Sequence, residues 1–202
     1  MTDRSRAQAH TLEGVTAALL VVMSIVLALQ MTAVTPLTAS TANQHIESQQ
    51  RAAAHGVLAT SDDGELRRAV RYWNSTNASF YGDGARGYYV GSGPTRLAFL
   101  DRLNETFEGS GVAYNVRVVY LRGPDLERNV KPIVYNGAPT ENAVTAARTV
   151  TLYDRDRLYR PDGSGGVEPT NRTLADANYF ASDASETAVY STVRVEVVVW
   201  RM

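Results

Sequence analysis

The sequence predicts an α+β protein with an N-terminal transmembrane helix and an amphipathic extension, two further helices, and then a four-stranded antiparallel meander. Three observations predict this order. An uncharged apolar run comes first, apolar residues then recur at helical spacing to about residue 108, and from residue 112 they alternate at every second position. Helices followed by a run of strands indicate the α+β class.

The apolar run, residues 14–34, contains no Asp, Glu, Lys, Arg or His and is long enough to cross a bilayer as one helix. The nearest positive charges precede it, which favours a cytoplasmic N-terminus and an extracellular C-terminal part. Pro36 is expected to kink or break the helix. The expected parts are a cytoplasmic segment at 1–13, a transmembrane helix at 14–35, an amphipathic helical stalk at 36–60 and an extracellular α+β head at 61–202.

Helical spacing resumes beyond Pro36. Residues 41–59 place four apolar side chains near one face, which are Ile46, Ala53, Val57 and Leu58. A second helix is predicted at 62–73, where Asp62 and Glu65 form a capping box at its start. Its apolar residues recur at the spacing of one helix face, so it is expected to pack on a core.

A loop rich in Asn, Ser and Gly is predicted at 74–93, with a short strand at 88–90. A third helix follows at 94–108. Pro94 suits its first turn and Gly109 its end. The side chains expected to face inward are Leu97, Leu100, Leu103 and Phe107.

Strands are predicted in the C-terminal half, at 112–120, 130–135, 144–152 and 189–199. Pro132 indicates that the second of these is an edge strand, because proline donates no ladder hydrogen bond. The polar residues 155–187 are expected to form a long surface excursion. The last strand carries the strongest apolar alternation and ends close to the C-terminus, so it is expected to be buried and central.

Composition narrows the classes of function. The formal net charge is −1, so nothing indicates a nucleic-acid partner. The chain has no cysteine, so its head must be held together by packing alone. Four Asn-x-Ser/Thr sequons follow the apolar run, which favours an outward-facing head open to glycosylation. Their asparagines are Asn74, Asn77, Asn104 and Asn171.

Several motifs could carry chemistry, but none predicts a catalytic, cofactor or metal site. Residues 82–87 match GxGxxG but follow no strand and open no helix, so they indicate a flexible loop. The three histidines are not spaced as metal ligands. Asp154 and Asp156, with Asp162 nearby, are interpreted as solvated charges, with a weak cation site as the alternative. Tyrosines from Tyr81 to Tyr89 would form a contact patch if exposed.

The N-terminal junction Arg6-Ala7-Gln8 stands directly before the apolar run. A cut there would leave the apolar helix attached to the mature chain, unlike a secretory signal, which is cut after its apolar core. Glu13 lies directly before the apolar run, where a carboxylate is energetically costly unless it is paired or reaches water. It is interpreted either as the partner of a new amine at Gln8 in a neighbouring subunit or as a headgroup-level residue.

These residues, with the apolar run to Val34, resemble the N-terminus of type IV pilins and pilin-like or pseudopilin-like subunits, archaeal ones in particular. The predicted order of the head also resembles the pilin fold. One departure is that a cut before Gln8 makes Glu13 the sixth mature residue, where bacterial pilins have the acid fifth. The opening also resembles that of an uncharacterised set of haloarchaeal membrane-anchored proteins with a QAHTLEG-type N-terminus, associated with secretion or pilus-like genes.

The resemblance implies a non-enzymatic structural subunit of a cell-envelope filament or secretion machine, with no cofactor. Its expected partners are the membrane, which it crosses once, copies of itself or other pilin-like subunits, and a prepilin-peptidase-like enzyme. Two alternatives stay open. One is a membrane-anchored extracellular binding or sensor domain that does not polymerise, and the other is a secreted enzyme released by a cut after the apolar run.

Overall fold

The computed structural model describes residues 2–123, 125, 127–183 and 187–202, and within the first helix it describes the side chains of 10–30 and 44–60. The chain divides into two compact units, Met1–Ile46 and Glu47–Met202. The second unit is called the head from here on. It begins before residue 61 because the last turns of the first helix contribute to its core.

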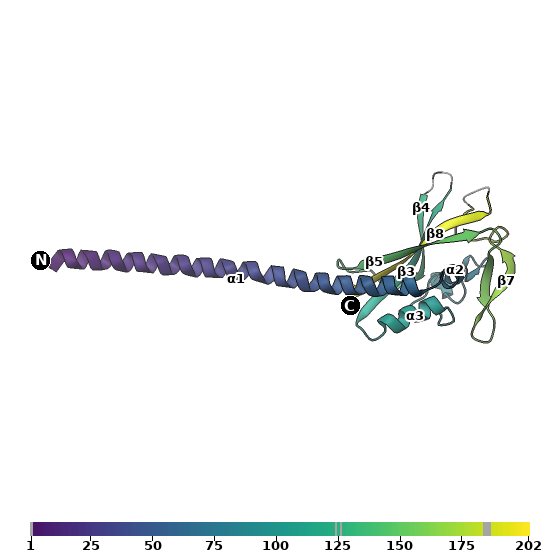
Figure 1. Cartoon of the computed structure of the whole chain (residues 1–202), viewed down its shortest axis with the longest axis horizontal. Coiled ribbons are helices and arrows are strands. Elements are labelled where there is room, and N and C mark those ends of the chain that lie inside the picture. Colours follow the sequence, from purple (N-terminus) through teal and green to yellow (C-terminus); the bar gives the residue numbers. More distant parts are fainter. Residues whose placement is uncertain (1, 124, 126, 184–186) are drawn as a thin grey trace. The chain divides into compact units, whose positions relative to one another are not determined.

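The first helix, α1 (Thr2–Thr60), contains a segment, His10–Gln30, that is long and apolar enough to cross a membrane (Figure 1). The predicted apolar helix is thereby confirmed in length and composition. The expected break at Pro36 is wrong, because the backbone stays helical through this residue. Proline already has a helical φ, and the hydrogen bonds of the turns on either side continue the helix past the bond that it cannot donate.

The end of α1 is buried in the head. Of the predicted apolar face, Val57 and Leu58 are buried and Ile46 and Ala53 are half-buried, and Ala54, which was not predicted, is buried as well. Arg148 closes this helix end: its Nη1 donates to the carbonyls of Leu58 at 2.7 Å and Ser61 at 2.6 Å. Leu58 O lies in the last turn of α1 and Ser61 O directly follows the helix, so the guanidinium satisfies carbonyls at the point where the helical hydrogen bonds end.

Two short helices follow. In α2 (Asp63–Val70) the Asp62 side chain accepts from Glu65 N at 2.6 Å, as the predicted cap requires. This helix ends earlier than predicted, because Trp73 enters the two-stranded sheet of β1 (Trp73–Asn74) and β2 (Ser79–Phe80). The predicted third helix is α3 (Ala98–Phe107), which leaves Pro94 in the preceding turn. A 3₁₀ turn, η1 (Gly84–Arg86), lies between β2 and α3.

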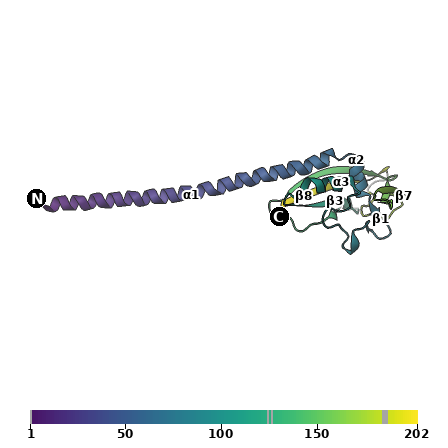
Figure 2. The ribbon, with the colours of Figure 1, turned by 90° about the horizontal axis from the view of Figure 1, so that it is seen from below.

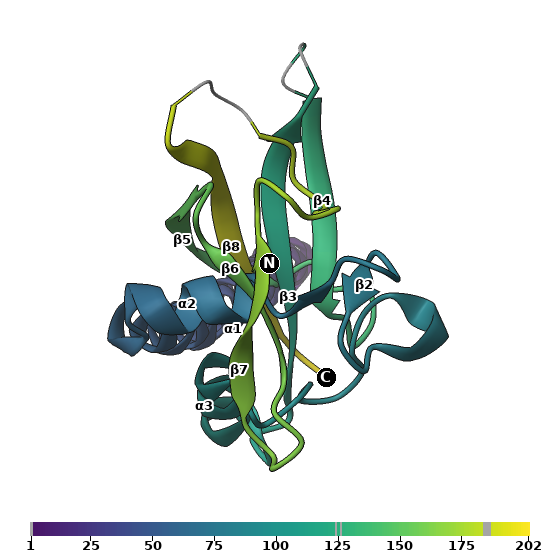
Figure 3. The ribbon, with the colours of Figure 1, turned by 90° about the vertical axis from the view of Figure 1, so that its right-hand side faces the viewer.

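The main sheet has four antiparallel strands in the order β4-β3-β8-β5. Figure 3 shows β3 and β4 side by side, and the short helices lie beside the strands (Figure 2). The strands are β3 (Val112–Arg122), β4 (Glu127–Val134), β5 (Val144–Tyr153) and β8 (Val189–Arg201). β4 is an edge strand and β8 a central one, as predicted.

The predicted meander order is wrong, since β8 pairs between β3 and β5. The physical reason is that β8 is apolar on both faces: Val195 and Val197 face the helices, and Val198 and Trp200 are buried on the other side. Only a central position buries both sets. Side chains also alternate between the two faces along β5. This alternation places Arg148 on the helix side, among strand residues that are otherwise apolar.

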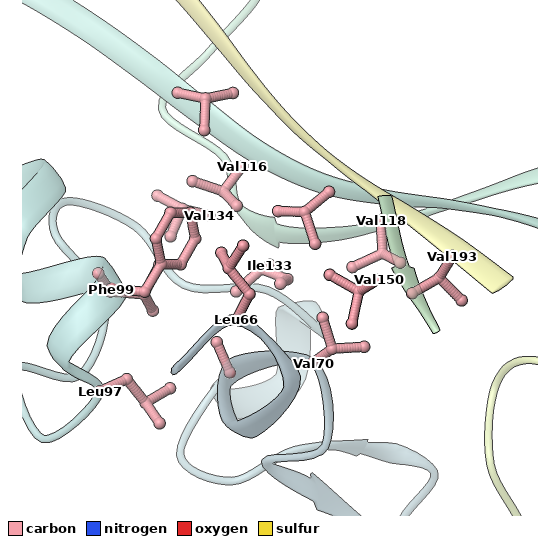
Figure 4. Close-up of a cluster of buried hydrophobic side chains, with 14 of the residues drawn as sticks. Leu66, Val70, Leu97, Phe99, Val116, Val118, Ile133, Val134, Val150 and Val193 are labelled. Carbon is pink, nitrogen blue, oxygen red and sulfur yellow. The ribbon is translucent and has the colours of Figure 1, made fainter. Parts of the chain in front are cut away.

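The expected surface excursion at 155–187 is wrong in part. It contains the hairpin of β6 (Arg157–Pro161) and β7 (Val167–Thr173), and its side chains Leu158, Leu174, Tyr179 and Phe180 belong to the core. Because the residues of the turn between these two strands are polar, the sequence did not indicate that the strands pair. Figure 4 shows the centre of this core, where Leu66, Val70 and Phe99 of the helices meet Val116, Val118 and Val193 of the sheet.

Candidate functional site

The predicted processing residues Arg6, Ala7 and Gln8 lie on the helical backbone of α1, but their side chains are outside the described residues. Glu13 is exposed, and one of its carboxylate oxygens lies 3.7 Å from His10 Nδ1. Further along, Thr16 and Ser24 each donate their hydroxyl to a carbonyl one turn back, at 2.8 Å. Hydroxyls satisfied inside the helix in this way are compatible with a lipid surrounding.

The four sequon asparagines differ in exposure. Asn77 and Asn171 are exposed. Asn74 is half-buried, and its side-chain oxygen accepts from Thr76 N at 2.9 Å and Asn77 N at 3.3 Å. Asn104 is also half-buried and donates to Glu108 at 3.0 Å. Glycan attachment therefore has its freest access at Asn77 and Asn171.

The Tyr-rich loop forms one wall of a cavity of about 430 Å³ in the head. We call it the tyrosine cavity, and its aromatic and charged lining consists of Tyr72, Tyr81, Tyr88, Tyr89, Arg86 and Arg96 together with Asp83. The volume is within the range of small-molecule sites. Because tyrosine rings offer flat apolar faces and guanidiniums offer fixed donors, this lining suits a ring-shaped ligand with acceptor groups.

The walls of the tyrosine cavity are held in place. Tyr89 donates its hydroxyl to Tyr81 O at 2.6 Å, and its backbone pairs with β4 through Ile133 O at 2.8 Å. Burial raises the pKa of Tyr89 well above its usual range, so this hydroxyl stays protonated as a donor. The Asp83 carboxylate accepts a hydrogen bond from Phe80 N at 3.0 Å and therefore stabilises the loop.

The GxGxxG run at 82–87 lies on this loop. It follows the two-residue strand β2 and contains the 3₁₀ turn η1 where a nucleotide-binding fold would have an α-helix, and its Gly82, Gly84 and Gly87 have positive φ. This agrees with the loop predicted from the sequence, and the glycines permit its left-handed turns.

The face of the main sheet that points away from the helices carries a group of charges. Glu196 of β8 is buried, with its side chain 5% exposed. Its oxygens lie 2.8 Å from Arg117 Nε, 3.2 Å from Arg194 Nε and 3.7 Å from Arg128 Nη2. We call these four residues the arginine patch. One carboxylate facing three guanidiniums leaves two positive charges in excess.

The three aspartates interpreted as solvated charges lie in two different turns of the head, and only Asp162 is exposed. Asp156 pairs with Arg67 and, at 3.4 Å, with Arg71. Asp162 accepts from Ser164 N at 2.8 Å and Gly166 N at 2.9 Å, which lowers the pKa of its exposed carboxyl. Asp154 lies in the turn that contains Asp156, and its N–H donates to Ala188 O at 3.2 Å, whereas its side-chain atom Oδ1 is buried with no hydrogen-bond partner among the described residues. Within the described part of the chain, no three His, Asp or Glu side chains are grouped as metal ligands.

Comparison with known proteins identifies the family of the chain. A family model described as a family of unknown function, DUF7288, matches residues 6–199. The chain belongs to this family. The match begins at Arg6 and therefore covers the apolar helix together with nearly all of the head. No curated protein and no solved structure matches the chain.

Sequence reasoning found some of these residues and missed others. The tyrosines of the loop were singled out by their density, but Arg86 and Arg96 were not. Arg194 and Glu196 were recognisable as the outward positions of the last strand, whereas Arg117 and Arg128 join them only through strand pairing. The one signal in the sequence was the repeated placement of charge at outward positions of apolar strands.

Proposed function

We propose that this protein is a pilin-like or pseudopilin-like structural subunit, anchored by α1 with its N-terminus inside and its head outside the cell membrane. It serves as a non-enzymatic part of an envelope filament or secretion machine. The observation that carries this proposal is the continuity of α1, whose apolar exposed segment and whose buried final turns belong to one helix, Thr2–Thr60, followed by an antiparallel sheet.

The exposed segment supports anchoring. Over His10–Gln30 the large apolar side chains are between 45 and 71% exposed, from Val26 to Leu12. Each such side chain gains about 1.5–3 kcal/mol from leaving water, so the segment is stable only in lipid or against other apolar helices.

The same segment supports assembly. Gly14, Ala17 and Ala18 are small and lie within one turn of each other, so backbones of neighbouring helices can approach closely. Glu13 precedes them directly. In an assembled bundle its carboxylate would neutralise the amine that processing before Gln8 creates on a neighbouring subunit.

The experiment is mass spectrometry of the mature N-terminus on the native membrane fraction, combined with electron microscopy of filaments sheared from cells. A chain that starts at Gln8 and is present in the sheared fraction supports the proposal. A chain that retains its first seven residues would contradict processing. A start near Asn43 would instead indicate a secreted domain and favour the enzyme alternative.

A second candidate function, a membrane-anchored binding head, is favoured by the tyrosine cavity. Its pre-formed walls and two exposed arginines suit a small ligand with a ring and an acid group. Thermal-shift screening of acidic monosaccharides against the full chain tests it. Binding that is lost in Arg86→Ala/Arg96→Ala supports a binding role, and an unshifted melting temperature with every probe contradicts it.

A further inference from the structure

The arginine patch is bordered by exposed apolar side chains on the same sheet face. Leu121 is paired with Arg128 across β3 and β4, and Val130 is paired with Val119. Leu121 is 45% exposed and Val130 46%. A surface that combines cations with uncovered apolar side chains is typical of protein contacts, because arginine is enriched where partner carboxylates dock.

The opposite side of the head is acidic. Asp101, Glu105 and Glu108 lie at i, i+4 and i+7 of α3 and its C-terminal cap, so they share one side of the helix. We call them the acidic stripe. The neighbouring Arg102 also interacts with Glu105, but its guanidinium bonds Glu65 at 2.8 and 3.2 Å. The stripe, Glu65 and Arg102 together therefore keep a net charge of −3, from four carboxylates and one guanidinium.

The sheet separates these two surfaces. Phe107 of α3 packs on Tyr114 of β3 with ring centroids 5.8 Å apart, so α3 covers the face that carries Tyr114. Arg117 is three residues further along β3 and therefore points to the other face. The arginine patch and the acidic stripe thus lie on opposite sides of one core.

We propose that the arginine patch of one head docks on the acidic stripe of the head of a second copy. This contact rests on the proposed assembly function and deepens it, since it names the surfaces that join neighbouring heads. Two excess positive charges meet three negative charges, and Leu121 and Val130 are covered in the process. Because the two surfaces differ and face opposite ways, the contact is heterologous and repeats along an open array.

Charge reversal at two positions tests the contact. Arg128 is 61% exposed and is the most distant of the three arginines from Glu196, so Arg128→Glu disturbs the fold least. Glu108 caps the C-terminus of α3, where the helix dipole favours the cation of Glu108→Arg. Each single reversal is expected to lower head-to-head cross-linking roughly tenfold, and the double reversal to restore it.

Matched controls keep the charge change but move it elsewhere. Glu141→Arg and Arg172→Glu alter exposed side chains outside both surfaces, so cross-linking should remain as in the wild type. High salt should weaken the wild-type contact in the same direction as the single reversals. Equal loss in the controls would overturn the assignment of the contact to these surfaces.

The absence of native cysteine gives a direct geometric readout. Ala98 is exposed and lies seven residues before Glu105, on the same side of α3, and Thr149 is exposed and paired with Arg194. In membranes treated with a bismaleimide, Ala98→Cys mixed with Thr149→Cys should give dimers. The double-cysteine chain should give a ladder, and each single variant alone should give neither.

The outcomes separate this contact from the proposed function. Sheared filaments of wild type without the mixed cross-link would overturn the head contact and leave assembly standing. Cross-links within one single-cysteine variant would show a symmetric contact and also overturn it. Occupancy of Asn104 by a glycan in the native protein would do the same, since it would cover the acidic stripe. The mixed cross-link without any filament would instead keep the contact and overturn the filament function.

Discussion

Arg148 interrupts the apolar alternation of β5 and closes the end of α1. Three donors from this one side chain reach Leu58 O, Ser61 O and the Asp63 carboxylate, the last at 2.7 Å. The side chain thereby joins the end of α1, the start of α2 and the sheet. A single residue thus satisfies carbonyls at the end of the long helix.

Replacing Arg148 with Met should destabilise the head by about 1.5–3 kcal/mol, because carbonyls at a helix end lose charge-assisted bonds. Urea denaturation of the full chain in detergent, followed by far-UV circular dichroism, measures this. Arg172→Met is the control, since Arg172 is exposed on β7 and should stay within about 0.5 kcal/mol of wild type. Equal stability of the two variants would contradict the capping role.

Tyr114 presents the opposite case, a buried hydroxyl that has no hydrogen-bond partner among the described residues. Tyr114→Phe is therefore expected to leave the head unchanged or to stabilise it by about 1 kcal/mol, because an unmade bond carries a desolvation cost. Tyr179→Phe is the matched control. Its hydroxyl donates to Val70 O at 3.0 Å, so its loss should destabilise by about 1 kcal/mol.

Alkaline pH gives a second prediction for Tyr114. Burial, and to a lesser extent the nearby Glu108 charge, raises the pKa of Tyr114 to about 12. A phenol whose pKa is raised on folding stabilises fully below its unfolded value, near 10, and loses that contribution as the pH rises to 12. Stability measured from pH 9 to 12 should therefore fall less steeply in Tyr114→Phe. An identical slope in the two proteins would contradict this.

At the scale of elements, α2 is joined to the turn before β6 by an ionic and aromatic junction. Asp156 faces Arg67 and Arg71, and the Arg71 guanidinium lies 5.1 Å from the centre of the Tyr159 ring. Burial lowers the pKa of Arg71, while the Asp156 carboxylate opposes this shift. The carboxylate is therefore what makes burial of the cation tolerable.

Asp156→Asn should cost about 3 kcal/mol, because it leaves two guanidiniums without their counter-ion at a junction only 14% exposed at the carboxylate. Thermal denaturation of the full chain measures the loss. Glu168→Gln is the control: Glu168 pairs with Arg160 in an exposed hairpin pair, which is worth less than about 1 kcal/mol. A similar loss in both variants would contradict the junction.

At the scale of the whole molecule, the apolar helix and the head differ in what they require. The helix exposes its large apolar side chains over His10–Gln30, whereas the head buries most of its own in one large and one small cluster. A variant lacking residues 1–46 is expected to be soluble, with the melting temperature of the full chain. Fractionation of cell lysates and calorimetry measure these two properties. Retention of that variant in the membrane pellet would contradict anchoring by α1.

The sequence alone determined the apolar helix, the two short helices and all four strands of the main sheet. These features are local, because helices and strands place their apolar residues at intervals of 3.6 and 2 residues. These intervals can be read directly from the sequence. It also determined that β4 lies at an edge and β8 in the centre, because Pro132 removes a donor and β8 carries the strongest apolar alternation of the chain. The density of tyrosines in the loop is likewise evident from the sequence, because these residues lie close together along the chain.

Only the tertiary structure decided how distant residues meet. The place of β8 between β3 and β5, the capping of α1 by Arg148 and the hairpin hidden in residues 155–187 all depend on contacts across many residues of chain. The arginine patch has the same origin, because strand pairing brings Arg117, Arg128 and Glu196 together. Periodicity records which face a side chain takes, but strand order and register decide its neighbours across the sheet.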